Sequence, residues 1–297
     1  MQKPILVMPE MRSLLKRSAQ AVAIVGALAC AASLQAGETR RVEGLEFDEL
    51  LIFGPMNVEV RQGEPAELQI QGPDGLTDKV KYRISGDTLT IGSGKSGDRK
   101  VLENISFRVI LPQLQRLKLK GSGDVYVKPF DFTQTRRGEP AEISLEGSGD
   151  IKLYGVQGPS LELRVKGSGN IKALSISVAQ LDTFVAGSGG VFIQTLQAKD
   201  AELTVTGSGD ATVTEESFIE SLEVNVIGSG DANLETVDCE KAEINIVGSG
   251  DVRIGRVTKL LAASILGSGD VRYRGDPDVD SIELGSGEVR RSEERER

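Results

Sequence analysis

The sequence predicts an all-β fold, a parallel β-helix, and three observations support this prediction. The tetrapeptide Gly-Ser-Gly-Asp, or a variant that differs at one residue, recurs about every twenty residues, apolar residues alternate on both sides of it, and aromatic residues make up only 4% of the chain. Such a period indicates a solenoid, whose units bury their apolar faces only by stacking on one another. The nine motifs begin at Gly121, Gly147, Gly167, Gly187, Gly207, Gly228, Gly248, Gly267 and Gly285.

Each repeat carries three short apolar segments, which predict three strands. Apolar residues precede each motif at alternate positions, follow it at alternate positions, and recur in a third short pair. This period of two is typical of a strand with one buried face. Examples are Leu161, Leu163 and Val165 before a motif, Val252 and Ile254 after one, and Ile176 and Val178 in the third segment. Three strands and three corners close a coil of about twenty residues.

The motif itself predicts a corner between two strands. Glycine tolerates a positive φ and has no Cβ that would collide with the next coil, and Ser and Asp side chains can bond nearby backbone amides. The repeat also extends toward the amino terminus, because Gly63–Gly72 aligns with Gly138–Gly147. We therefore expect twelve corners in all, the first three at Gly54, Gly72–Gly75 and Gly92.

These corners predict a single β-helix domain over residues 37–288, followed by a charged tail at 289–297. A solenoid needs covered ends, because an open end exposes unpaired strand edges. The tail can discourage end-to-end stacking at one end. Leu45, Phe47 and Leu50 are candidates for closing the other end.

Residues 1–36 predict a signal peptide. Basic residues precede the apolar run Ala19–Ala32, and Ala36 offers a small residue for cleavage. Either Met1 or Met11 can be the true start. Cleavage after Ala36 removes four basic residues and one acidic residue, so that the net charge changes from −9 to −12. We expect an acidic exported protein in the periplasm or on the cell surface of a bacterium.

The two cysteines suggest no disulfide framework. Cys239 lies at an inward position and is predicted to be a core residue. Cys30 follows small residues in the leader, which makes it a candidate for lipidation and would anchor the chain to a membrane. Soluble and lipidated forms both remain open.

Two rows of mainly acidic residues are predicted on the outer surface. The first lies five residues before the motif glycines and contains Glu142, Glu162, Asp182, Glu202, Glu223 and Glu243. The second follows the corners and contains Asp124, Asp150, Asn170, Gly190, Asp210, Asp231, Asp251 and Asp270. One interpretation is a surface for calcium or a cationic partner, with Asp210, Asp231, Asp251 and Asp270 as metal ligands. The interpretation that we favour needs no cofactor, because Glu can solubilise a strand face and Asp can cap corner amides.

Catalytic chemistry has little support in this chain. There is no histidine, which excludes Ser-His-Asp and Cys-His catalysis and histidine-bearing zinc sites. No glycine-rich segment leads into a phosphate-binding Gly-Lys-Ser/Thr helix start, and a net charge of −9 disfavours nucleic acid. Parallel β-helices do include polysaccharide lyases and hydrolases, so a carbohydrate-active enzyme is the alternative function. Tyr126 and Tyr154 are the outward aromatic residues that could contact a sugar.

Several segments resemble a known bacterial family, the putative auto-transporter adhesins with a head GIN domain. They are Phe47–Pro55, Val58–Val60, Gln62–Gly63, Gly86–Ile91, Leu111–Leu114 and Gly121–Val125. The resemblance covers nearly all of the chain after the leader. It implies an exported, single-stranded, right-handed β-helix without an established activity. We therefore expect a non-catalytic envelope or surface scaffold that binds a protein or glycan, and neither the partner nor the oligomeric state follows from the sequence.

Overall fold

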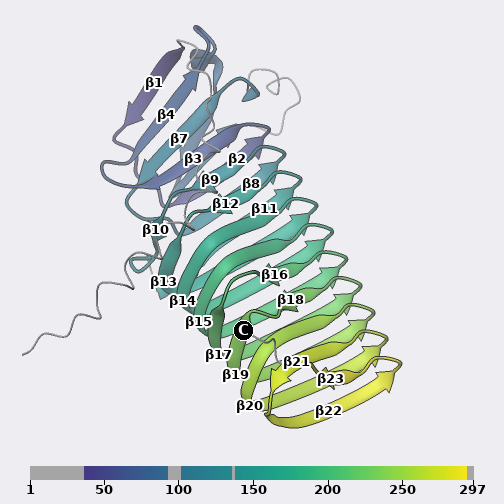
Figure 1. Cartoon of the computed structure of the whole chain (residues 1–297). Coiled ribbons are helices and arrows are strands. Elements are labelled where there is room, and N and C mark those ends of the chain that lie inside the picture. The colour runs from purple at the N-terminus through teal and green to yellow at the C-terminus, as the bar shows by residue number, and fades with distance from the viewer. Residues whose placement is uncertain (1–36, 93–101, 136–137, 293–297) are drawn as a thin grey trace, which may run out of the picture. The chain divides into compact units, whose positions relative to one another are not determined.

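The structure is a computed structural model that describes residues 37–92, 102–135 and 138–292. Glu38–Arg297 form one compact unit, whose described part consists mainly of stacked β-strands (Figure 1). The strands are β1 (Glu38–Glu43), β2 (Glu49–Gly54), β3 (Asn57–Gln62), β4 (Glu67–Gly72), β5 (Tyr82–Ser85), β6 (Thr88–Gly92), β7 (Ser106–Leu111), β8 (Arg116–Gly121), β9 (Val125–Val127), β10 (Phe130–Asp131), β11 (Ala141–Gly147), β12 (Ile151–Leu153), β13 (Val156–Gly167), β14 (Ile171–Gly187), β15 (Val191–Gly207), β16 (Ala211–Val213), β17 (Ser217–Gly228), β18 (Ala232–Leu234), β19 (Val237–Gly248), β20 (Val252–Gly267), β21 (Val271–Gly275), β22 (Asp278–Gly285) and β23 (Val289–Arg291). A 3₁₀ turn spans Thr77–Lys79.

From β8 onward the strands form the predicted parallel coils. β11, β13, β14, β15, β17, β19, β20 and β22 pair in parallel, each with the next, and bring the motif glycines into one stacked column. The coils are about 20 residues apart, as the motif spacing predicts. The fold is thus the expected β-solenoid.

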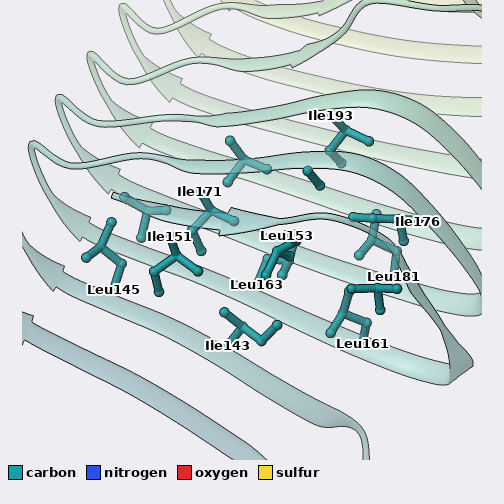
Figure 2. Close-up of a cluster of buried hydrophobic side chains, with 14 of the residues drawn as sticks. Ile143, Leu145, Ile151, Leu153, Leu161, Leu163, Ile171, Ile176, Leu181 and Ile193 are labelled. Carbon is teal, nitrogen blue, oxygen red and sulfur yellow. The ribbon is translucent and has the colours of Figure 1, made fainter. Parts of the chain in front are cut away.

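The core is a column of aliphatic side chains inside the coils. Ile143 pairs in register with Leu163, and Ile151 pairs with Ile171, so buried residues of one coil lie over those of the next (Figure 2). These four side chains are completely buried. Burial of one such side chain stabilises a fold by about 1.5–3 kcal/mol, which explains why every coil repeats the alternating pattern.

Both glycines of the motif are required by the close approach of adjacent corners. Gly228 has a φ of 130°, and a Cβ on this residue would lie 2.3 Å from the carbonyl oxygen of Gly207. A Cβ on Gly230 would lie 2.0 Å from the carbonyl oxygen of Gly209. The Gly207 carbonyl also accepts the backbone N–H groups of Ser229 and Gly230, at 2.8 and 3.1 Å. Hydrogen bonds between corners therefore leave no room for a side chain.

The amino-terminal end differs from the expectation of further parallel coils. Gly54 does lie at a corner, next to Gly121 in register. Gly72, however, ends β4, which runs antiparallel to β1 and β7, so it is not a corner of the stack. Gly92 ends β6, the second strand of an antiparallel hairpin with β5, and lies beside Phe53. The prediction of twelve corners is wrong, because an alternation with a period of two does not reveal strand direction.

These strands cover the amino-terminal end of the core. β7 pairs with β3, β4 pairs with β7, and β6 pairs with β2, so that antiparallel segments extend the parallel sheets. Phe47 and Leu50 are buried in the core and Leu45 packs against it, and closure of this end by these three residues stays a prediction.

Among the described strands, β22 is the last one of its column. β22 pairs with β20, and every residue of β22 is exposed. Within the described ranges, no further strand pairs with the other edge of β22. β23 pairs with β21, so strand structure continues into the segment 289–297 that we interpreted as a tail.

Candidate binding face

The residues that follow the corners form a ladder of backbone caps, which we call the corner row. In each pair, one Oδ1 accepts a hydrogen bond from the backbone N–H of the equivalent residue on the next coil. The pairs are Asp124–Asp150 (3.1 Å), Asp150–Asn170 (3.0 Å), Asn170–Gly190 (3.1 Å), Asp210–Asp231 (3.1 Å), Asp231–Asp251 (2.8 Å), Asp251–Asp270 (3.0 Å) and Asp270–Glu288 (3.2 Å). Gly190 has no side chain and interrupts the ladder. The favoured interpretation, that these Asp residues cap corner amides, is confirmed.

Basic residues two positions further along the chain pair with the corner row. Lys172 Nζ lies 2.7 Å from Asp150 Oδ2, and Arg253 Nη2 lies 2.8 Å from Asp251 Oδ2. Burial would raise the pKa of Asp150, but hydrogen bonds from Lys172 and from Asn170 outweigh it, so this pKa lies below its ordinary value. Cations of the protein itself therefore offset much of the repulsion between neighbouring carboxylates.

The proposed calcium ligands are parts of this ladder. Asp210, Asp231, Asp251 and Asp270 each use Oδ1 for a backbone cap. The described residues contain no group of three or more Cys, Asp or Glu side chains arranged to hold a metal ion. The structure thus gives these residues a role in folding, and calcium binding there stays a hypothesis.

The second acidic row lies on a different part of the coils, and we call it the groove row. Register places Glu142, Glu162, Asp182, Glu202, Glu223 and Glu243 beside one another on six successive coils. Neighbouring parallel strands are about 4.8 Å apart, so the carboxylates repeat at that distance. The sequence pattern identified this row correctly.

Four members of the groove row, Glu162, Asp182, Glu202 and Glu223, line a groove. It lies where the chain passes from the third segment of a coil into the next motif-preceding strand. β14 and β15 run through this connection without interruption. The groove has a volume of about 400 Å³. Its lining residues are Pro140, Ser160, Leu161, Glu162, Gln180, Leu181, Asp182, Asp200, Ala201, Glu202, Ser221 and Glu223. It therefore combines carboxylates with hydroxyl and amide groups.

The carboxylates at the centre of the groove lack basic partners. Glu142 pairs with Arg116 and Glu162 pairs with Arg164. In the described part of the chain, no Lys or Arg forms an ion pair with Asp182, Glu202 or Glu223. Burial, together with the charges of Glu223 and Asp182, raises the pKa of Glu202. The groove thus holds negative charge that the fold does not neutralise.

The remaining candidates have structural explanations or lie outside the described residues. Lys152 Nζ lies 4.9 Å from the ring centre of Tyr126, and Lys128 Nζ lies 4.3 Å from that of Tyr154, so a lysine covers one face of each ring. Cys239 is buried in the core, and burial raises its pKa to about 12, as expected of an unreactive thiol. Cys30 and the rest of the leader lie outside the described residues. Within those residues, no helix has the length and hydropathy of a membrane span.

The fold and this face define a class of repeat protein, a β-solenoid with an exposed acidic groove. A family model described as putative auto-transporter adhesin, head GIN domain, matches residues 46–220 and 214–277. The chain belongs to this family, which confirms the resemblance seen in the sequence.

Solved structures share the fold. A putative adhesin from Parabacteroides distasonis is 18% identical with a TM-score of 0.63, and the match covers 86% of this chain and 97% of that one. A putative lipid binding protein from the same organism is 24% identical with a TM-score of 0.60, at the same coverages of 86% and 97%. A putative adhesin from Parabacteroides merdae is 18% identical with a TM-score of 0.63, covering 86% and 96%. No curated protein matches the chain.

Proposed function

We propose that this chain is an exported, non-catalytic scaffold of the bacterial cell envelope or surface, and that it binds its partner along the acidic groove. Membership of the adhesin family and the fold shared with proteins described as adhesins support a surface-binding role. The basic and apolar segments of residues 1–36 support export.

One observation carries the proposal: the two acidic rows differ in their partners. In the corner row the carboxylates cap backbone amides, and basic side chains face several of them. In the groove row, Asp182, Glu202 and Glu223 lie side by side, and among the described residues neither a backbone cap nor a basic side chain pairs with them, although Asn225 Nδ2 donates a hydrogen bond of 2.9 Å to Glu223 Oε1. Two unit charges about 5 Å apart repel by roughly 0.8 kcal/mol even in water. Folding does not require this cost, and a bound cationic group would offset it.

The groove favours a partner with several positive groups in a row. Its carboxylates repeat at the strand spacing of about 4.8 Å, so consecutive amino or guanidinium groups can each face one of them. Ser160, Gln180 and Ser221 add hydrogen-bonding groups to the lining. A basic protein segment and an amino-sugar polymer share this chemistry.

Calorimetry with an oligolysine peptide and with a chitosan oligomer tests the groove. We expect at least one of them to bind, with an affinity that falls as salt rises, because exposed charges are screened. The triple variant Asp182→Asn, Glu202→Gln and Glu223→Gln should lose about tenfold or more in affinity. The matched control removes three charges from β22, by Asp278→Asn, Asp280→Asn and Glu283→Gln, and should bind like the parent. Equal losses in both variants would show that only net charge matters, and no binding of either probe would contradict a cationic partner.

Export has its own test. The protein recovered from the cell envelope should begin near Gly37, or at a blocked Cys30 if it is lipidated. N-terminal sequencing and mass spectrometry of that form distinguish the two. Recovery of the protein with its leader intact in the cytoplasm, and nowhere else, would contradict the export proposal and leave the groove tests unaffected.

A further inference from the structure

Four aliphatic side chains form an exposed row on the carboxyl-terminal coils, which we call the aliphatic row. Ile227, Val247, Leu266 and Leu284 occupy the position directly before the motif glycine, and register places each beside the next. They are 51%, 46%, 55% and 61% exposed. A continuous apolar surface that stays exposed marks an interaction site more often than isolated apolar residues do.

The surroundings of the aliphatic row are uncharged. The neighbouring column, two residues earlier on each strand, contains Asn225, Asn245, Ser264 and Ile282. The Asn245 amide donates a hydrogen bond of 3.0 Å to Asn225 Oδ1, and Ile282 is 60% exposed and widens the apolar surface. The corner side adds small serines.

On the three coils of β8, β11 and β13 the same position is charged instead, whereas Phe53 occupies it on β2. Lys120, Glu146 and Lys166 occupy it, and Ala186 and Thr206 separate them from the aliphatic row. The change from charged to aliphatic residues along one column shows that the fold itself does not demand apolar residues there.

The chemistry of the row argues against a membrane as its partner. Surfaces that insert into lipid headgroups combine apolar residues with Lys, Arg and aromatic side chains, and anionic membranes repel acidic proteins. This face has no basic or aromatic side chain on its four coils in the two columns described, and the chain carries a net charge of −9.

We propose that the aliphatic row is the contact surface for a second copy of this chain, related by a twofold axis that makes the two stacks antiparallel. In this arrangement Ile227 faces Leu284 of the other copy, and Val247 faces Leu266. In a parallel dimer, Lys166 would face Lys166 of the other copy and Glu146 would face Glu146 of the other copy, and each pair would repel. The antiparallel dimer overlaps only along the uncharged coils, and a twofold contact of this kind closes on itself.

The contact is small, so we expect a concentration-dependent equilibrium between monomer and dimer. The row spans about 14 Å over its four coils, and interfaces that bury less than about 1,200 Å² are typically weak. Sedimentation equilibrium of the purified chain over a range of concentrations measures the association constant directly. A chain that stays monomeric at its solubility limit would overturn the proposal.

Leu266→Lys tests the centre of the row. It places a charge against Val247 of the other copy and should weaken association by about tenfold or more. Leu174→Lys is the matched control, because Leu174 is 48% exposed but lies outside the row, and it should associate like the parent. Circular dichroism verifies that both variants are folded. If both variants self-associate as strongly as the parent does, the proposal is overturned. It is also overturned if the parent floats with phosphatidylcholine vesicles and Leu266→Lys does not.

Disulfide cross-linking tests the antiparallel arrangement. The double variant Ile227→Cys and Leu284→Cys should form a covalent dimer on mild oxidation, because the two positions face each other. Ile227→Cys alone should not, because its counterpart would lie about 14 Å away along the row. The parent, whose Cys239 is buried, is the background control. Cross-linking of Ile227→Cys alone would show a parallel dimer and overturn the arrangement.

Discussion

Asp231 Oδ1 accepts a hydrogen bond of 2.8 Å from the backbone N–H of Asp251, the residue at the same position on the next coil. Two acidic residues thus lie side by side because one of them bonds the main chain of the other. Arg253 lies beside both carboxylates, with Nη2 at 2.8 Å from Asp251 Oδ2 and Nη1 at 4.0 Å from Asp231 Oδ2. The row that resembles a metal site in the sequence is a set of caps between coils.

The cap can be tested by comparing two substitutions of Asp231. Asp231→Ala removes the acceptor and should lower the free energy of unfolding by about 1.5–3 kcal/mol, as is typical for a hydrogen bond to a charged group. Asp231→Asn keeps an acceptor and should lose roughly half as much. Urea denaturation measures both. In the parent, calcium should shift the melting temperature no more than matched ionic strength does, and a larger shift that Asp231→Asn abolishes would favour the metal interpretation.

The stacked corners predict a large cost for a side chain at Gly228. Gly228→Ala should lower the free energy of unfolding by about 3 kcal/mol or more, because backbone strain alone costs about 1–3 kcal/mol and the Cβ would also meet the Gly207 carbonyl. Gly86→Ala is the control, since Gly86 has a φ of 59° and a Cβ on this residue would meet no other atom within 4 Å. It should cost about 1 kcal/mol. Similar losses in the two variants would contradict the close contact between corners.

The raised pKa of Glu202 predicts a pH-dependent gain in stability for Glu202→Gln. A carboxyl whose pKa is higher in the folded state than in the unfolded state destabilises the fold when it is ionised. This penalty is complete above the folded-state pKa and disappears as the pH falls below the unfolded-state pKa. Glu202→Gln should therefore raise the melting temperature at pH 7 and leave it unchanged near pH 3.

Asp150→Asn should change the stability in the opposite direction. The pKa of Asp150 is lowered, so its ionised form stabilises the fold above the unfolded pKa, and this contribution is lost as pH falls toward the folded pKa. The variant should be less stable than the parent at pH 7, with a difference that shrinks in acid. Melting curves of both variants from about pH 3 to pH 7 provide the comparison. Differences that do not change with pH would show that ionisation is not their cause.

A buried hydroxyl inside the coils predicts a stabilising substitution. Thr183 is paired in register between Leu163 and Leu203, and its Oγ1 is buried without a hydrogen-bond partner. Thr183→Val removes the unpaired group at similar volume and should stabilise the fold by about 1–3 kcal/mol. Thr206→Val is the control, because Thr206 Oγ1 donates to the Val185 carbonyl at 3.1 Å. Thermal melts that show no gain for Thr183→Val would indicate that a water or a backbone group satisfies the hydroxyl.

The parallel coils could be predicted from sequence because their geometry repeats. A glycine such as Gly228 and an alternation such as Leu222, Val224 and Val226 recur at a nearly constant interval, and only stacked coils bury all of these residues together. The positions of the two acidic rows followed from the same interval. In a regular fold, residues at a constant interval in the sequence therefore lie at a constant distance from one another in space.

The parts that could not be predicted depend on contacts between distant residues. Gly72 follows an alternation identical in kind to that before Gly147, but β4 finds antiparallel partners in β1 and β7. The corner row and the groove row are both acidic at a period near twenty. Only the fold shows that Arg253 pairs with Asp251 of one row, whereas none of the described Lys or Arg side chains pairs with Asp182, Glu202 or Glu223 of the other.

The antiparallel strands at the amino-terminal end also determine how far these molecules can polymerise. Fibres grow when each chain offers at both ends an edge on which the next identical chain can be added in register. The free edge of β22 is parallel to the stack, whereas β1 and β5 run antiparallel to their neighbours at the other end. Repeated head-to-tail addition would have to join two unlike edges. For the described part of the chain, we therefore expect this mismatch to disfavour an unlimited filament.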